Sequence, residues 1–163
     1  MRRPLPALIL LVGFAGCAVE AIEDSTGGGE PVQSSGSQAE FLSTPEQEAM
    51  GFPFSEAVRV GPMLYLSGQI GNVPGTTQMA DGGIQAETRQ TLVNISEVLD
   101  RYGSAMNRVV KCLVMIENMA EWPAMNEVYA EFFPGRKPAR SALGADGLAL
   151  GALVEIECMA TVG

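Results

Sequence analysis

Apolar residues in the second half of the chain fall into short runs that predict individual strands. Residues 57–60 and 63–67 flank Gly61 and Pro62, which predicts a β-hairpin. Residues 109–116 form a nearly continuous apolar and β-branched run, as is typical of an interior strand. Two further runs, at 139–145 and 153–162, predict the strands that close the chain.

Two other segments carry apolar side chains at helical spacing. The first spans residues 85–102, ends at Gly103 and has its stripe at Thr91, Ile95, Val98 and Tyr102. The second begins near Pro123, ends before Pro134, and has its stripe at Trp122, Met125, Tyr129 and Phe132. Each helix is apolar on one side only, so we expect both to cover a sheet.

The order of these elements is ββαβαββ. It predicts the α+β class, with one mixed β-sheet and two helices on one face. A turn-rich segment at residues 71–83 separates the hairpin from the first helix. We expect a single domain over residues 46–163.

The last predicted strand distinguishes the two faces of this sheet. Period-two alternation assigns Val154, Ile156, Cys158 and Ala160 to one face, suited to a helix-covered core, and Glu155, Glu157 and Met159 to the other. By the same rule Arg140, Ala142 and Gly144 share a face. The helix-free face would carry apolar residues such as Leu113, Met115 and Leu153. Because exposed apolar patches mark interfaces, we expect self-association through that face.

The N-terminus predicts a targeting segment. Arg2 and Arg3 precede an apolar run of eleven residues, 5–15, that ends in small residues before Cys17. The run is too short to span a bilayer, which takes about 20 helical residues. Residues 1–16 resemble a bacterial lipoprotein signal peptide, with Cys17 as the lipidated residue. The alternative is an ordinary secretory signal with an incidental cysteine.

Residues 17–45 would then comprise the lipidated cysteine and a linker. The segment is rich in Gly, Ser, Glu and Gln and lacks the apolar content that offsets the entropy of ordering. We interpret it as a flexible tether that holds the domain at a membrane of the bacterial cell envelope, on the periplasmic or extracytoplasmic side. A mobile recognition segment is the alternative.

Charge and composition exclude several classes of function. The formal net charge is −9, and removal of residues 1–16 with Arg2 and Arg3 changes it to −11. Because phosphate binding requires clustered cations, we expect no nucleic-acid partner. The chain has no histidine, so acid–base chemistry must use other side chains. Cys17, Cys112 and Cys158 lack metal-ligand spacing, so we expect no metal.

An ordered set of motifs over the predicted domain resembles the RidA/YjgF family. The motifs are Gly51-Phe52-Pro53-Phe54-Ser55, Leu66-Ser67-Gly68-Gln69-Ile70, Glu87-Thr88-Arg89-Gln90, Met125-Asn126-Glu127-Val128-Tyr129, Phe132-Phe133-Pro134, Pro138-Ala139-Arg140-Ser141 and Val154-Glu155-Ile156-Glu157. The resemblance implies a chorismate-mutase-like (YjgF) fold and a homotrimer with pockets between subunits. It also implies hydrolysis of reactive enamines and imines, such as 2-aminoacrylate and 2-iminopropionate, to 2-oxo acids and ammonia, without a cofactor.

The resemblance also assigns roles to residues. Arg140 matches the arginine that holds the substrate carboxylate, for which a planar guanidinium is suited. Glu155 matches the acidic residue that positions or activates water. The two would meet around one small acid in a cleft shared by neighbouring protomers, and their placement on opposite sides of the sheet would contradict that. Substrate contacts are implied for Ser67, Gly68, Asn126 and Ala142. Phe54 stands where a tyrosine is common, so a hydroxyl is missing and an aromatic wall remains.

Simpler interpretations stay open for each of these residues. Arg140 could pair with a surface carboxylate, and Glu155 could be solvated. Cys112 and Cys158 could be buried thiols on the helix-covered face, or a disulfide if their strands adjoin. A trimer that binds small carboxylates without turnover is the alternative to the deaminase, and the ribonuclease activity attached to the family by name is a third possibility.

Overall fold

We describe the protein from a computed structural model, in which residues 38–163 are described. The predicted signal, Cys17 and most of the predicted linker lie outside these residues. The strands are β1 (Ala39–Leu42), β2 (Ala57–Val60), β3 (Met63–Leu66), β4 (Gln69–Ile70), β5 (Val109–Ile116), β6 (Ala139–Gly144) and β7 (Val154–Thr161). The helices are α1 (Pro45–Met50), α2 (Gly83–Arg101) and α3 (Trp122–Phe132), with 3-10 turns η1 (Met106–Arg108), η2 (Met119–Glu121) and η3 (Ala149–Gly151). No helix among them is long and apolar enough to cross a membrane.

All seven strands form one sheet, and its mixed pairing is as the sequence predicted from five of them. Its order is β1-β2-β3-β7-β5-β6, and β4 also pairs with β7. Only β5 and β6 run parallel, because α3 connects them. β3 and β4 both pair with β7, one after the other along its length. Between them, at Ser67 and Gly68, the chain does not pair with β7. This break positions one part of the site described below.

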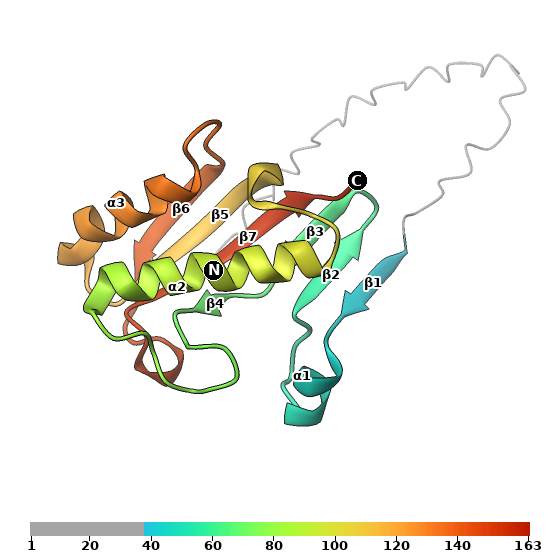
Figure 1. The fold of residues 1–163 in the computed structure, drawn as a ribbon, viewed down its shortest axis with the longest axis horizontal. Helices are drawn as coiled ribbons and strands as arrows, with labels where there is room; N and C mark the ends of the chain where they lie inside the picture. The colour runs from blue at the N-terminus through green and yellow to red at the C-terminus, as the bar shows by residue number, and fades with distance from the viewer. Residues whose placement is uncertain (1–37) are drawn as a thin grey trace, which may run out of the picture. The chain divides into compact units, whose positions relative to one another are not determined.

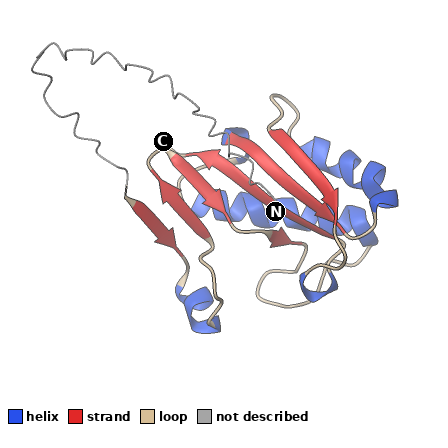
Figure 2. Cartoon of the chain, turned by 180° about the vertical axis from the view of Figure 1, so that it is seen from behind, coloured by secondary structure: helices blue, strands red, loops and turns tan. Residues whose placement is uncertain are grey.

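Helices α2 and α3 cover one face of the sheet, and no helix of residues 38–163 covers the opposite face (Figures 1 and 2). The core lies between, with the predicted inward residues of β7, Val154, Ile156, Cys158 and Ala160, all buried. Glu155, Glu157 and Met159 point to the helix-free face and are half-buried. The predicted assignment of faces in β7 is therefore confirmed. Leu153, expected on the helix-free face, instead packs against the core just before β7.

The prediction missed β1, α1 and β4. The side chains of β1 are mostly exposed, so no apolar alternation marks it; the strand is held by main-chain pairing with β2 and by an ion pair between Glu40 and Arg59. Helix α1 buries no residue and is marked only by its N-cap, Thr44, and Pro45. The expectation of a tether up to residue 45 is therefore wrong for residues 39–42, which extend the sheet before the predicted domain start.

Cys112 and Cys158 form a disulfide between the two central strands. They lie directly opposite each other in β5 and β7, and both are buried on the helix-covered face, as predicted. Of the two possibilities that the sequence leaves open, the structure has the disulfide and not free thiols, because the register brings the two side chains together. Residues 46 positions apart are thereby linked covalently.

Candidate functional site

Arg140 lies on the helix-covered side of the edge strand β6. It pairs in register with Cys112 of β5, and residues paired across neighbouring strands point to the same face. Its guanidinium carbon lies 4.6 Å from the centre of the Tyr129 ring and 5.3 Å from that of Trp122, both on α3. Among residues 38–163, no carboxylate lies within ion-pair distance of Arg140. Its N–H groups are thus left for another partner.

A pocket of about 350 Å³ opens beside this arginine. It is lined by Asn126, Tyr129, Ala130, Phe133, Lys137, Pro138 and Arg140. Lys137 donates one hydrogen bond, from Nζ to the carbonyl oxygen of Phe133 at 3.0 Å, and forms no ion pair within the described residues. Two cations therefore lie at one pocket of a strongly acidic protein. We call Asn126, Tyr129, Lys137 and Arg140 the basic half-site.

Glu155 lies on the helix-free side of the sheet, in the row of side chains formed by Met115 of β5 and Leu143 of β6. Burial raises the pKa of its carboxyl group, and the nearby carboxylate of Glu157 raises it further. A larger fraction of Glu155 is therefore protonated near neutral pH than for an exposed glutamate. Such a group is suited to exchanging a proton with a reacting molecule.

Gly68 packs directly against this carboxyl group. A Cβ atom built on Gly68 would overlap Oε1 of Glu155, so only glycine leaves room for the side chain as it lies. The preceding residue, Ser67, is fixed by a hydrogen bond from its Oγ to the carbonyl oxygen of Ser55 at 2.7 Å. The break between β3 and β4 thus brings Ser67 and Gly68 beside Glu155.

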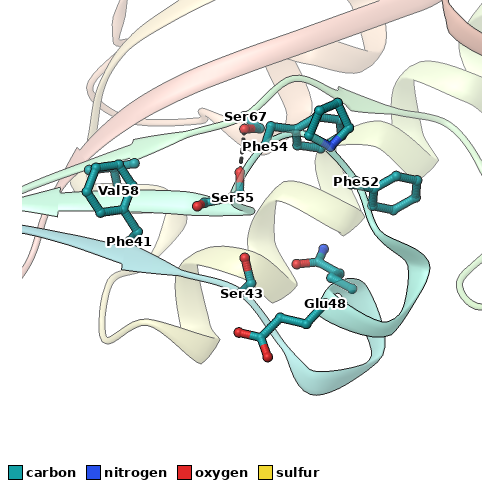
Figure 3. A pocket seen from close by; sticks show the side chains of 10 residues that line it. Phe41, Ser43, Glu48, Phe52, Phe54, Ser55, Val58 and Ser67 are labelled. Carbon is teal, nitrogen blue, oxygen red and sulfur yellow. Dashed lines mark hydrogen bonds between the residues drawn. The ribbon is translucent and has the colours of Figure 1, made fainter.

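Phe54 and Ser67 line a second pocket, of about 550 Å³, between β1, α1 and the start of β2 (Figure 3). Phe52 and Phe54 stack in parallel, with ring centres 5.3 Å apart, and both are exposed. They form an aromatic wall next to the serine. We call Phe54, Ser67, Gly68 and Glu155 the acidic half-site.

The two half-sites do not meet within one chain. Arg140 lies on the helix-covered side of the sheet and Glu155 on the opposite side, which is the placement that contradicts the predicted meeting of the two, so that expectation is wrong for the two side chains of one chain. The physical reason is the register: Arg140 is aligned with Cys112, whereas Glu155 is aligned with Met115, three residues along β5 and on the other face. A site that uses both side chains needs one from each of two copies.

The remaining predicted contact, Ala142, lines neither pocket. Its side chain packs against the core on the same face as Arg140. Its backbone belongs to β6, whose outer edge pairs with no other strand in residues 38–163.

Two aromatic residues that contact Arg140 belong to the stripe that the sequence predicts to cover the sheet. Trp122 and Tyr129 fill the apolar stripe of α3, yet both rings contact Arg140. Asn126 lies between them on the same stripe, four residues after Trp122 and three before Tyr129. A polar residue within an aromatic stripe is the sequence signal that marks this helix face as part of a site.

Comparison with known proteins agrees with this architecture. The family model described as Endoribonuclease L-PSP matches residues 46–162. Reactive Intermediate Deaminase A, chloroplastic, of Arabidopsis thaliana is 35% identical over 80% of this chain and 70% of its own length. The 2-iminobutanoate/2-iminopropanoate deaminase of Mus musculus is 38% identical over 75% of this chain and 90% of its own.

The fold also matches solved structures. The crystal structure of RidA from an Antarctic Psychrobacter species superposes with a TM-score of 0.65 at 32% identity, and the match covers 68% of this chain and 89% of that one. The mixed sheet with two covering helices is therefore the chorismate-mutase-like YjgF fold. On these matches, the chain belongs to the RidA/YjgF family, whose sequence model is described as Endoribonuclease L-PSP.

Proposed function

We propose that the protein is a hydrolytic deaminase of 2-imino acids and their enamine tautomers, and that it releases a 2-oxo acid and ammonia. The names of the Arabidopsis and mouse relatives support this reaction class. The observation that carries the proposal is that Arg140 lies at a pocket without an ion-pair partner among the described residues. Arg140 is half-buried, and the pocket has a volume of about 350 Å³. A small carboxylate supplies that partner through two parallel hydrogen bonds.

The reaction needs little beyond a held substrate and a placed water molecule. Water adds to the imine carbon, the nitrogen gains protons, and loss of ammonia from the tetrahedral intermediate leaves the 2-oxo acid. Glu155 orients the water and transfers its proton toward the nitrogen. The raised pKa of Glu155 suits both steps, because the group must accept and release a proton near neutral pH.

The active assembly in this proposal is a homotrimer. Because Arg140 and Glu155 lie on opposite sides of one sheet, each site combines the basic half-site of one copy with the acidic half-site of the next. The helix-free face supports assembly, since Tyr65 and Leu143 expose apolar surface there and Leu113, Met115 and Met159 are only half-buried.

The central experiment offers the purified protein 2-iminopropionate generated in the assay. The unchanged protein should accelerate pyruvate formation over the spontaneous reaction, and Arg140→Ala should lose most of that acceleration. Arg136→Ala is the matched control, because it removes a cation from the same segment but from a residue outside the pocket lining. Equal rates with the unchanged protein, with Arg140→Ala and without protein would overturn the deaminase.

Binding without turnover is the second candidate, and Phe54 favours it. A phenylalanine provides an aromatic wall but no hydroxyl that could hold water. In that case, titration calorimetry should show 2-oxobutanoate binding that is lost in Arg140→Ala, with no acceleration of imine hydrolysis.

RNA cleavage is a third candidate, raised by the description of the family model. The net charge of −9 works against it, because binding to a polyanion relies on clustered cations. RNA cleavage that persists in Arg140→Ala and follows the protein through purification would support it.

We further propose that the protein is a lipoprotein of the bacterial cell envelope, attached through Cys17. The disulfide between Cys112 and Cys158 supports a location outside the reducing cytoplasm. Cells fed radioactive palmitate should label the unchanged protein and not Cys17→Ala. Equal labelling of both proteins would contradict the anchor.

A further inference from the structure

The guanidinium of Arg140 is held in an unusual way for a half-buried cation. Half-buried arginines are normally fixed by a carboxylate or by backbone carbonyl groups. The described residues offer Arg140 no ion pair, and its guanidinium carbon lies 4.6 Å and 5.3 Å from the centres of two aromatic rings. Both distances lie within the range of about 6 Å in which a cation is attracted to the face of a ring.

We propose that Trp122 and Tyr129 are positioning residues that hold Arg140 by cation–π contact and leave its N–H groups free for an anionic ligand. The nature of the ligand rests on the proposed function, whereas the ring contacts do not. If a carboxylate of the protein held Arg140 instead of the rings, it would accept hydrogen bonds from those N–H groups and neutralise the positive charge of the guanidinium. Aromatic rings restrict the guanidinium without competing for its hydrogen bonds.

The geometry of α3 makes this arrangement rigid. Trp122 and Tyr129 are seven residues apart, which places them two turns apart on one helix face. Pro123 lies in the first turn and stiffens the helix start beside Trp122. Tyr129 is buried and its ring also packs against Phe133, with centres 4.8 Å apart. The rings therefore have fixed places to which the flexible arginine side chain conforms.

The ring of Tyr129, and not its hydroxyl group, is the acting part. The hydroxyl oxygen is buried and makes no hydrogen bond within the described residues. Tyr129→Phe keeps the ring and removes the hydroxyl group, whereas Tyr129→Leu removes the ring. This pair separates the cation–π contact from any effect of the hydroxyl group.

The first measurement is nuclear magnetic resonance of the unchanged protein without ligand. Ring currents should shift the Arg140 side-chain signals upfield of the other arginines, and Arg140 protons should show contacts to the Trp122 indole. The shift should persist in Tyr129→Phe and shrink in Tyr129→Leu and in Trp122→Leu. Arg140 signals at the position of a solvent-exposed arginine, without contacts to the indole, would overturn the proposal even if the leucine variants failed to fold.

The second measurement concerns ligand affinity. Loss of one ring should raise KM for the imine, or Kd for 2-oxobutanoate, by between about 2-fold and 30-fold, the range expected for one cation–π contact. We expect kcat to stay within about twofold, because the carboxylate is held equally in ground state and transition state. Tyr129→Phe keeps the ring, so it should raise KM or Kd less than Tyr129→Leu does.

These outcomes keep the two proposals distinct. An inactive protein that still binds 2-oxobutanoate with the predicted variant pattern, or that shows only the predicted ring-current shifts, removes the deaminase and supports the aromatic clamp. An active protein whose KM and Arg140 signals are unchanged in Tyr129→Leu and Trp122→Leu retains the deaminase and overturns the clamp.

Discussion

At the scale of single residues, Gly68 and Glu155 constrain each other. Gly68 is not in the left-handed region, so its backbone would accept another residue; the constraint is the space taken by the carboxyl group of Glu155. Because that group ends a flexible side chain, it can turn away from a new methyl group. Such a change should alter the position of the carboxyl group more than the stability of the fold.

We therefore expect Gly68→Ala to lower kcat of the deaminase at least about tenfold, the loss typical of a displaced proton-transfer group. The free energy of unfolding should change by no more than about 1 kcal/mol, since no backbone strain is introduced. Steady-state kinetics and urea unfolding measure the two quantities. Gly135→Ala is the control, because a Cβ there meets no atom within 4 Å. Unaltered kcat in Gly68→Ala would show that the placement of Glu155 is irrelevant.

Glu87 carries a buried carboxyl group, and its role is in the fold. It accepts a hydrogen bond at Oε2 from the backbone N–H of Leu153 at 2.8 Å, which ties α2 to the start of β7. Burial raises the pKa of Glu87, and the hydrogen bond from Leu153 opposes the rise only in part. The folded state therefore holds this proton to a higher pH than the unfolded chain does.

Linkage gives the direction of the resulting effect. Between the ordinary pKa of 4.5 and the raised folded value, the folded state binds more protons, so its stability falls as pH increases through that window. Glu87→Gln removes the titration and keeps an oxygen acceptor. Urea unfolding at pH values from about 4 to 8 should show the free energy of unfolding of the unchanged protein falling relative to the variant. Glu97→Gln, at an exposed position of the same helix, controls for lost charge. Parallel curves for the unchanged protein and Glu87→Gln would contradict the assignment.

At the scale of elements, the disulfide links the two strands at the centre of the sheet. Cys112 in β5 and Cys158 in β7 are 46 positions apart, and closing a loop of that size restricts the unfolded chain. We expect Cys112→Ala/Cys158→Ala to lose about 2–4 kcal/mol of unfolding free energy. Chemical denaturation checks this.

The control for the disulfide uses a reductant. Dithiothreitol should lower the Tm of the unchanged protein and leave that of the double variant unaltered. If titration shows both thiols free and the Tm is nevertheless unchanged, the cross-link does not stabilise the fold.

Elements whose apolar side chains form a clear run or repeat were predictable from the sequence. Elements fixed mainly by main-chain hydrogen bonds were not. The run at residues 109–116 is observed as β5 with the same bounds, because its apolar side chains fill the core on one face and form apolar surface on the helix-free face. β1 exposes its side chains and is fixed by pairing with β2, so its sequence carries no such signal. The side of the sheet that Arg140 occupies was likewise beyond prediction, since it depends on the register between β6 and β5.

At the scale of the whole molecule, the two half-sites lie on opposite faces of one chain and cannot form a single site within it. Asn126 and Arg140 belong to one face of the protomer, and Gly68 and Glu155 to the other. If each active site combines halves from two copies, every subunit contributes its arginine to one site and its glutamate to another. A substitution that inactivates the basic half-site of a subunit therefore leaves the acidic half-site of that subunit intact, and the reverse also holds.

This separation predicts complementation between two inactive variants. Arg140→Ala and Glu155→Gln should each lack activity alone. In oligomers assembled at random from equal amounts of both, a site is complete when an intact Glu155 meets an intact Arg140 from the other variant. Each event has a probability of one half, so about a quarter of the sites should be active, whatever the size of the ring.

Co-expression of both variants in equal amounts, without selection for mixed oligomers, yields this random population, and its deaminase rate per subunit is the measurement. Separately purified variants that are mixed without exchange of subunits provide the control and should stay inactive. If Arg140 and Glu155 acted from the same chain, every site in a mixed oligomer would lack one of them. Activity no higher than that of the single variants would then place both groups in one subunit, in conflict with their positions on opposite sides of the sheet.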